Sequence, residues 1–261
     1  MTAAPIWLLG CGHMGGALLS RWLAEDLGPV AIIDPMPKAL PPGCTALSDP
    51  PPGQPDVLVL AIKPQVWRAA CQPLAGLIGA GTMVISIMAG ISVADIASVF
   101  PASAIVRAMP NTPAAIGQGA TALFTDAGDL AQGAAEALFG PAGATVWLGD
   151  EGQFDAVTAL SGSGPAYVFA FVEALATAGV RAGLDPALAM RLARATVIGS
   201  AALAAHEPGV VMADLRDRVT SPGGTTAAGL AELRPDLAGL LTRTVLAAAT
   251  RSRELREHRI P

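Results

Sequence analysis

Lysine is scarce in this sequence, and no stretch gathers positive charge. Lys38 and Lys63 are the only lysines, and the chain carries a formal net charge of −5 with acids spread along its length. Proteins that bind nucleic acid or an anionic membrane surface need clustered cations. We therefore expect neither a nucleic-acid partner nor a membrane partner. The absence of lysine after Lys63 also leaves the second half of the chain without a lysine for acid–base chemistry.

Cysteine and histidine are equally sparse. There are three of each, with no C-x-x-C pair and no two histidines close in sequence: Cys11, Cys44, Cys71, His13, His206 and His258. Disulfide frameworks and zinc sites need these residues in paired or closely spaced sets. The sequence therefore predicts neither a disulfide-bonded fold nor a metal site.

A hydrophobic content of 52% and a mean hydropathy of +0.51 raise the question of a membrane span. The uncharged stretch from Ala69 to Ala94 is long enough to cross a bilayer. However, Gln72, Pro73 and several glycines divide it into a helix end, a turn and a short strand. The N-terminus has no basic segment followed by an apolar core and a cleavage site, so we expect a cytoplasmic protein.

A glycine-rich turn lies near the N-terminus. The apolar segment Ile6–Leu9 predicts a strand, a helix is expected to about Glu25, and six residues of the form G-x-G-x-x-G lie between: Gly10, Cys11, Gly12, His13, Met14 and Gly15. In such a turn the first glycine makes the bend, the second admits a pyrophosphate and the third lets the helix meet the strand. We predict a dinucleotide site here, with a plain glycine turn as the alternative.

Polar residues follow the ends of the next predicted strands. The strand Val30–Ile33 ends at Asp34, where a carboxylate can meet the adenosine ribose of a dinucleotide. The apolar segment 57–62 is typical of a parallel strand covered on both faces, and Lys63 follows it. Ligands gather at such strand ends, which places Lys63 at the cofactor edge unless it is only a solvated lysine. By the same alternation Asn111 lies either beside the nicotinamide or in an ordinary turn.

The strand signals stop near residue 150. Further strands are expected at 82–87, 104–108, 120–124 and 145–148, and helices at 153–160, 167–183, 186–206, 210–217, 225–234 and 235–255. The predicted fold class is α/β, with an N-terminal Rossmann-type parallel-sheet domain over residues 1–149. An all-α domain over residues 150–261 follows it.

The helix expected from Ala166 to Gly183 is apolar on nearly every side. Its residues Glu173, Thr177 and Arg181 follow one another at i, i+4 and i+8 and so form one polar stripe. We expect it to pack against its own domain and against a partner subunit. An ordinary core helix is the alternative.

Two loops in the helical half are rich in small residues and hydroxyls. In the SGSGP segment, 161–165, Ser161 or Ser163 can cap the following helix and Pro165 suits its first turn. The segment 218–226, RVTSPGGTT, presents backbone N–H groups and hydroxyls at a helix start. It would hold a carboxylate well, although an ordinary capped helix entry has the same composition.

Six segments follow one another in the order and spacing of pyrroline-5-carboxylate reductases, a family that the sequence resembles over essentially its whole length. They are GCGHMG at 10–15, AIKPQ at 61–65, RAMPNTP at 107–113, ALSGSGPAY at 159–167, VTSPGGTT at 219–226 and RSREL at 251–255. The resemblance implies a Rossmann domain followed by an α-helical dimerisation domain, and a homo-oligomer. It also implies reduction of 1-pyrroline-5-carboxylate to proline by hydride from NADP(H) or NAD(H).

The resemblance also implies roles for individual residues. Besides the glycine turn, the expected cofactor contacts are Ala61, Ile62, Lys63, Pro64, Met88, Ala89 and Gly90. The expected substrate contacts are Asn111, Glu151, Ser163, Gly164, Gly224, Thr225 and Thr226, and Thr226 is the catalytic residue that hydrogen-bonds the ring nitrogen. Where the family commonly has an asparagine that meets the cofactor, this sequence has DPPPGQPD, with Ser48 or Asp49 as candidate replacements.

Cofactor preference is where the resemblance and the local chemistry differ. Many enzymes of this kind use NADPH, but a carboxylate at Asp34 favours the ribose hydroxyls of NADH and repels a 2′-phosphate. We therefore predict that NADH is used at least as well as NADPH.

Two other functions share parts of this sequence pattern. The 3-hydroxyacid dehydrogenase family has a similar glycine turn but uses a lysine of its helical half as the acid–base group. No lysine follows Lys63 in this sequence, which argues against that function. A non-catalytic nucleotide sensor would bind NADPH without turning over an imine.

Overall fold

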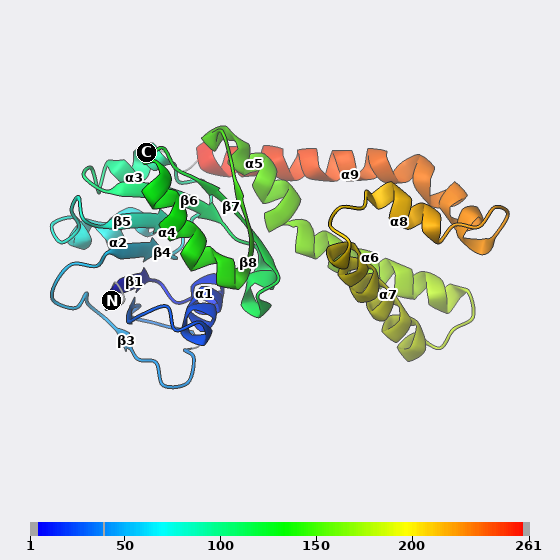
Figure 1. The fold of residues 1–261 in the computed structure, drawn as a ribbon, viewed down its shortest axis with the longest axis horizontal. Coiled ribbons are helices and arrows are strands. Elements are labelled where there is room, and N and C mark those ends of the chain that lie inside the picture. Colours follow the sequence, from blue (N-terminus) through cyan, green and yellow to red (C-terminus); the bar gives the residue numbers. More distant parts are fainter. Residues whose placement is uncertain (1–4, 39, 258–261) are drawn as a thin grey trace. The chain divides into compact units, whose positions relative to one another are not determined.

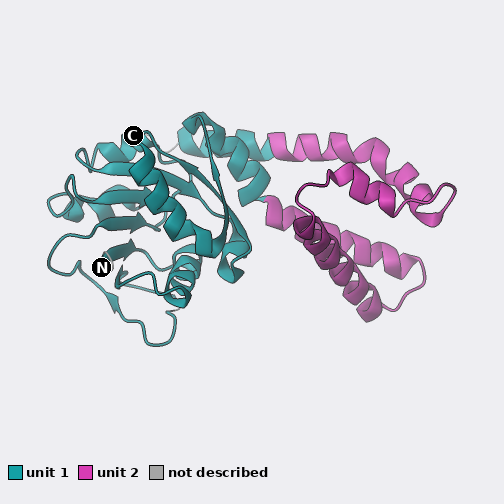
Figure 2. Ribbon diagram, viewed as in Figure 1, with its two compact units in different colours: residues 1–163, 247–261 teal, residues 164–246 magenta. Residues whose placement is uncertain are grey.

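The computed structural model describes residues 5–38 and 40–257, which form two compact units. Unit 1 comprises residues 1–163 and 247–261, and unit 2 comprises residues 164–246 (Figures 1 and 2). Both units include part of the last helix, α9. The first unit holds the sheet and the second is built from helices.

Unit 1 is organised around one eight-stranded sheet of order β3-β2-β1-β4-β5-β6-β7-β8. Its strands are β1 (Ile6–Leu9), β2 (Val30–Ile33), β3 (Ala46–Leu47), β4 (Val57–Leu60), β5 (Met83–Ser86), β6 (Ala104–Met109), β7 (Gly119–Phe124) and β8 (Gly143–Trp147). The order reverses at β1, where β2 lies on one side and β4 on the other. Such a switch point leaves a crevice outside the carboxyl ends of the strands.

The sheet departs from the predicted parallel arrangement in one place. β6 pairs antiparallel with β7, whereas the other neighbouring strands pair in parallel. Only the short 3₁₀ helix η2 (Thr112–Ile116) joins β6 to β7. Parallel strands need a crossover of a dozen or more residues, so a link this short returns the chain antiparallel.

Helices cover both faces of the sheet, and each face has its own apolar core. One core includes Leu8, Val59 and Ile85 with α1 (His13–Ala24) and α4 (Asp129–Phe139). The other includes Leu58, Val84 and Ile105 with the short helices α2 (Trp67–Cys71), η1 (Gln72–Leu74) and α3 (Val93–Ala97). A further 3₁₀ turn, η3 (Gly140–Ala142), leads from α4 into β8. The segment 69–94 thus divides into helix, turn, strand and loop, as predicted.

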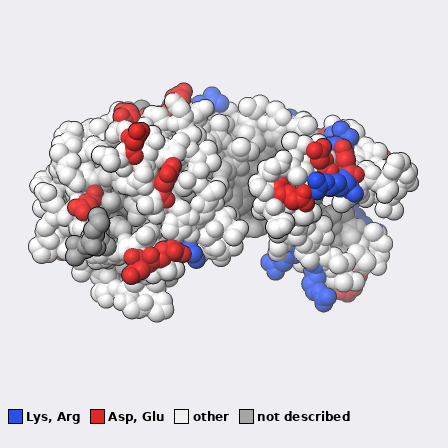
Figure 3. Space-filling view, in the orientation of Figure 1, with Lys and Arg blue, Asp and Glu red and all other residues white. Residues whose placement is uncertain are grey.

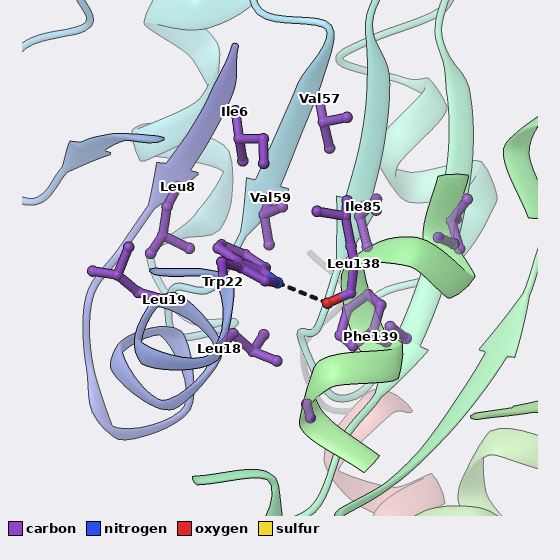
Figure 4. Packing of buried hydrophobic residues seen from close by; sticks show 14 of the residues in the cluster. Ile6, Leu8, Leu18, Leu19, Trp22, Val57, Val59, Ile85, Leu138 and Phe139 are labelled. Carbon is purple, nitrogen blue, oxygen red and sulfur yellow. Dashed lines mark hydrogen bonds between the residues drawn. The ribbon is translucent and has the colours of Figure 1, made fainter. Parts of the chain in front are cut away.

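Trp22 joins α1 to α4 across the first core. Its side chain is 1% exposed, and its indole N–H donates to the carbonyl oxygen of Leu138 at 2.7 Å (Figure 4). Figure 4 shows the ring lying among Leu18, Leu19 and Phe139 of the same core. The bond satisfies a buried donor and a carbonyl in the last turn of α4, where carbonyls lack partners within the helix.

The helix entering unit 2 is continuous where the sequence predicts a pause. After η4 (Glu151–Gln153) and α5 (Phe154–Val157), residues 158–162 form a π-helical turn (η5, Thr158–Gly162), and α6 (Gly164–Arg181) follows. The Ser163 N–H donates to the carbonyl oxygen of Thr158, the i→i−5 bond of a π turn. The small SGSGP residues therefore widen a helix instead of breaking it.

Unit 2 contains a helical hairpin of α6 and α7 (Pro186–His206), followed by α8 (Met212–Arg218) and α9 (Thr225–Glu257). Gly183 at φ +102° ends the first arm, and the Asp185 carboxylate caps α7 through the N–H groups of Ala187 and Leu188. The two helices expected at 225–234 and 235–255 are one helix with Pro235 inside it. Proline removes one helical hydrogen bond, and here the chain continues through that loss.

Two helical stretches within the described residues are long and apolar enough to cross a membrane, judged by length and composition alone: Glu151–Arg181 and Pro186–His206. Only 6% and 11% of their apolar windows are buried inside the single chain. Phe169 is 63% exposed and Ile198 is 62% exposed. Within one chain, α6 and α7 therefore keep apolar surface that a second surface must cover.

We predict that Trp22→Phe lowers the free energy of unfolding by about 1–3 kcal/mol, because phenylalanine keeps most of the buried ring but leaves the Leu138 carbonyl without its partner. The matched control is Trp147→Phe, whose N–H donates to Glu136 at 2.6 Å in an exposed position where water can replace it. Urea unfolding of both variants measures the difference. Equal losses would mean that the buried bond contributes nothing specific.

Candidate functional site

The glycine turn at the switch point depends on two glycines that no larger residue could replace. Gly10 has φ +93°, and a Cβ there would lie 2.6 Å from the Ile62 side chain and 2.7 Å from the Ala61 carbonyl oxygen. A Cβ on Gly15 would overlap the carbonyl oxygen of Gly10. Gly12 differs, because a Cβ there would meet nothing within 4 Å. Gly10 therefore makes the bend, Gly12 leaves open space for a ligand, and Gly15 allows the close approach of the helix, as expected of the three glycines.

The first turn of α1 offers its N–H groups to an anion. Gly12 is the N-cap and has no side-chain cap, and the first turn contains no acidic residue. The first N–H groups of a helix lack partners within the helix, and the helix dipole favours negative charge there. A pyrophosphate fits this end of α1.

Asp34 is tied to the backbone of the turn. Its Oδ2 accepts from the Cys11 N–H at 2.7 Å and its Oδ1 accepts from the Met36 N–H at 2.8 Å. Both carboxylate oxygens therefore hold the chain between β1, β2 and the following loop. The charge stays at the end of β2, where the sequence placed it.

A cavity of about 340 Å³ opens on this turn. It is lined by Gly12, His13, Met14, Lys38, Ala61, Ile62, Lys63, Pro64, Ile87, Met88 and Ala89. These residues come from the loops after β1, β2, β4 and β5, so the cavity gathers most of the cofactor contacts expected from the sequence. Lys38, Gly12 and His13 also line a neighbouring cavity of about 510 Å³ along α1. The loop after β2 therefore brings Lys38 back to the helix start, which the sequence left open.

Two buried thiols of unit 1, Cys11 and Cys71, are poor nucleophiles. Burial raises the pKa of the Cys11 thiol, and the charges of Asp34 and Cys44 raise it further. Burial also raises the pKa of Cys71 to about 12. Nucleophilic attack needs the thiolate, so neither residue serves covalent catalysis at neutral pH.

Asn111 joins the loop after β6 to the π turn. Its amide nitrogen lies 3.3 Å from both the carbonyl oxygen and the hydroxyl of Ser161, and its amide oxygen accepts from the Ala120 N–H at 2.8 Å. The structure thus brings together two segments that the sequence singled out separately. The Asn111 side chain is half-buried and spans the start of β7 and the SGSGP segment.

Glu151 points into the protein. Its Oε1 accepts from the Val93 N–H at 2.8 Å and from the Arg107 guanidinium at 2.7 Å. Arg107 is 5% exposed, and its guanidinium stacks 4.1 Å from the centre of the Phe154 ring. Burial lowers the pKa of Arg107, whereas the hydrogen bond and charge of Glu151 oppose that shift.

The structure adds functional candidates that the sequence reasoning did not single out. Arg107 belongs to the RAMPNTP motif, and an arginine inside an otherwise apolar strand is itself a signal of a buried charge partner. Asp155 is 8% exposed, accepts from the Ser252 hydroxyl at 2.7 Å and pairs with Arg256 at 3.1 Å. Its partners lie about a hundred residues away, so no local pattern could have found them.

A smaller cavity of about 220 Å³ lies beside these charges in unit 1. Its lining is Ala89, Gly90, Thr158, Ser163, Ala248, Arg251, Ser252, Leu255 and Arg256. Ala89 lines both this cavity and the cofactor cavity. Ser163, expected near the substrate, therefore shares a cavity with Ala89 and Gly90, which are expected to contact the cofactor.

The remaining candidate residues belong to unit 2. Gly164 opens α6, and Gly224, Thr225 and Thr226 lead into α9. Gly223 has φ +69° and the Gly224 N–H donates to the Ser221 carbonyl oxygen at 3.0 Å, so this loop is a tight turn at the helix start. The side chains of Thr225 and Thr226 are exposed.

Comparison with known proteins decides the family. Residues 151–255 match the model described as pyrroline-5-carboxylate reductase dimerisation, and residues 5–90 match NADP oxidoreductase, coenzyme F420-dependent. A pyrroline-5-carboxylate reductase from Synechocystis is 47% identical over 206 residues, covering 77% of this chain and 75% of that protein. The chain belongs to the pyrroline-5-carboxylate reductase family.

Solved structures of this family agree along the whole chain. The pyrroline-5-carboxylate reductase of Coxiella burnetii superposes with a TM-score of 0.88 at 33% identity, covering 97% of this chain and 99% of that one. The Plasmodium falciparum pyrroline carboxylate reductase, solved with NADP bound, has a TM-score of 0.81 at 26% identity and covers 98% and 99%. The predicted α/β fold with a following helical domain is therefore confirmed.

The helical region has two different starting points, one defined by the family's sequence model and one by contacts within the structure. The family's dimerisation model starts at residue 151, whereas the compact units divide after residue 163. Residues 151–163 stay with the sheet through contacts such as Phe154 with Met109 and Ala122. Among the described residues, no group of three His, Cys, Asp or Glu side chains could hold a metal ion.

Proposed function

We propose that this chain reduces 1-pyrroline-5-carboxylate to proline by hydride transfer from NAD(P)H. The observation that carries the proposal is the glycine turn with its cavity at the switch point, in a chain that shares the family's dimerisation region. Protonation of the cyclic imine makes its carbon electron-poor without a strong acid from the enzyme. The protein then has mainly to align the reacting carbons and exclude water.

Reduced nicotinamide cofactor supplies the hydride when bound. Gly12 leaves space for the pyrophosphate, and the uncapped start of α1 neutralises part of its charge. Lys38, an exposed residue that lines the same cavity, adds a positive charge. The other cofactor contacts are the residues after β4 and β5: Ala61, Ile62, Lys63, Pro64, Met88, Ala89 and Gly90.

Substrate recognition falls to the two loops that the sequence singled out. The proposed substrate contacts are Ser163 and Gly164, which follow the π turn, and Gly224, Thr225 and Thr226 at the start of α9. Asn111 holds the π turn in place through Ser161. Thr226 is the residue that hydrogen-bonds the ring nitrogen. A hydroxyl suffices there because the imine needs orientation and a hydrogen-bond partner, not a strong acid.

The working protein is a homo-oligomer that pairs through its helical region. α6 and α7 expose apolar side chains in the single chain, and the matched family region is a dimerisation region. A second subunit covers these faces, which also accounts for two helices apolar enough to cross a membrane. We place the enzyme in the cytoplasm.

Turnover of synthetic pyrroline-5-carboxylate tests the activity directly. We expect loss of the reduced-nicotinamide absorbance and stoichiometric formation of proline. Oxidation of a 3-hydroxyacid by NAD(P)+ without any turnover of the imine would instead indicate a hydroxyacid dehydrogenase. NADPH binding without turnover of either substrate would indicate a nucleotide sensor.

Thr226→Ala is expected to lower kcat about 10-fold to 1000-fold while leaving cofactor affinity nearly unchanged, because it removes one hydrogen bond at the reacting group. Steady-state kinetics and a separate cofactor titration measure the two effects. Thr242→Ala is the matched control, since the Thr242 hydroxyl donates only to the Ala238 carbonyl oxygen within α9. A kcat equal to that of the control would remove Thr226 from catalysis.

Asp34→Ser is expected to shift the ratio of kcat/KM values toward NADPH, and the wild type is expected to use NADH at least as well as NADPH. The fixed carboxylate at the end of β2 repels a 2′-phosphate carrying about 1.5 to 2 negative charges. The control for general loss of charge is Asp56→Ser. Asp56 directly precedes β4, whereas Asp34 follows β2, so the two carboxylates lie at opposite ends of the parallel strands. A wild-type preference for NADPH above about tenfold, roughly 1.4 kcal/mol, would assign recognition to Lys38 or Ser48.

Phe169→Glu is expected to give monomers or insoluble protein. Phe169 is 63% exposed in the single chain, so the new carboxylate would lose its water only when the subunits assemble, and burying an unpaired charge is costly. The matched control is Thr177→Glu, which adds the same charge to the exposed polar stripe of α6. Sedimentation velocity or light scattering measures the mass. A soluble dimer of Phe169→Glu would place the subunit interface elsewhere.

A further inference from the structure

Glu151 connects three segments of unit 1 through one oxygen atom. It begins η4, its Oε1 accepts from Arg107 in β6 at 2.7 Å, and the same Oε1 accepts from the Val93 N–H at 2.8 Å. Arg107 brings a full positive charge that burial does not remove, since a guanidinium stays protonated in proteins. The Oε1 atom of Glu151 therefore already accepts from two donors of the protein, the Arg107 guanidinium and the Val93 N–H.

Val93 is the residue through which this carboxylate reaches the cofactor loop. It is the first residue of α3, and the segment Met88–Gly90 lies just before it in the chain. Gly90 has φ +75°, and Ala89 packs against the cluster of Met109, Ala122 and Phe154. Glu151 therefore fastens the end of a loop whose other residues line both cavities of the site.

The same turn is also fastened on its other side. Phe154 lies under the Arg107 guanidinium, and the adjacent Asp155 holds Ser252 and Arg256 of α9. Two positive and two negative side chains thus neutralise one another around η4 and α5. One member of each pair, Arg107 or Asp155, is buried and the other is partly exposed. Removing a partner leaves a buried charge uncompensated, so the pairs favour one arrangement of the segments they join.

We propose that Glu151 and Arg107 are positioning residues for the nicotinamide end of the cofactor site, acting through the Val93 N–H on the loop 88–92. Glu151 holds the loop in place instead of binding the substrate, which revises the role expected from the sequence. The inference rests on the proposed function for the identity of the cofactor. Its physical basis is that a small displacement of a reactant from its productive position costs a large factor in rate.

Val93→Pro gives the sharpest test, because it deletes one N–H and nothing else of the network. Proline is favoured at the first position of a helix, and Ser92 before it already has the extended backbone (φ −82°, ψ 164°) that proline requires. We expect a higher Kd for the reduced dinucleotide and a kcat lower by about tenfold or more. Binding of ADP-ribose, which lacks the nicotinamide, should be unchanged.

Glu151→Gln is the second variant, since it keeps an acceptor for Val93 but removes the charge that Arg107 needs. We expect the same pattern as for Val93→Pro. Glu136→Gln is the matched control, because that carboxylate accepts from the Trp147 indole N–H in an exposed position away from the site. The melting temperature of each variant shows whether a loss of binding or activity comes from an unstable fold or from a displaced loop 88–92.

Three results would overturn the proposal. Unchanged dinucleotide affinity and kcat in both variants would show that the network only stabilises the fold. A rise confined to the KM of the imine acid in Glu151→Gln would show direct substrate contact. Equal weakening of ADP-ribose binding would show a general effect on the unit. If the wild type turns over no imine, the proposed function fails, whereas the two binding constants still decide the positioning role.

Discussion

The close approach of backbone at the β1–α1 turn is the constraint on which the rest of unit 1 depends. Gly10 passes against the end of β4, and Gly15 lets α1 meet the carbonyl of Gly10. A side chain at either position would push α1 away from the sheet. The start of α1 would then no longer face the crevice between β1 and β4, and Trp22 could not reach the last turn of α4.

Charge is used sparingly and in fixed places. Asp34 accepts from the Cys11 N–H of the glycine turn and from the Met36 N–H of the loop after β2, and one oxygen of Glu151 accepts from both Arg107 and Val93. In a chain with 14% charged residues, these carboxylates set loop positions that apolar packing cannot, because hydrogen bonds have direction. Exposed charges behave differently. Figure 3 shows acidic side chains scattered over unit 1 and both signs together near α8, where Arg218 pairs with Glu207.

The sequence predicted the dinucleotide turn well because its pattern is local. A strand, three spaced glycines and a helix lie within about twenty residues, and each glycine has its own steric reason. Errors arose where the outcome depended on distant partners or on competition between near-equal states. β7 runs antiparallel to β6, a π turn replaces the expected break at SGSGP, and α9 continues through Pro235. Each of these costs or gains only a few kcal/mol locally, so tertiary packing decides it.

By itself, the sequence indicated most of the strands, the glycine turn and the family, but not β3 or the unbroken α9. Periodicity and glycine spacing act over short stretches of chain, and the six motifs were enough to indicate the reaction. Only the tertiary structure decided which distant residues come together: Lys38 lines one cavity with Gly12 and His13, Asn111 contacts Ser161, and Asp155 pairs with Arg256. These pairs are tens to about a hundred residues apart in the chain. Their contacts follow from how the elements pack, which no local pattern of residues encodes.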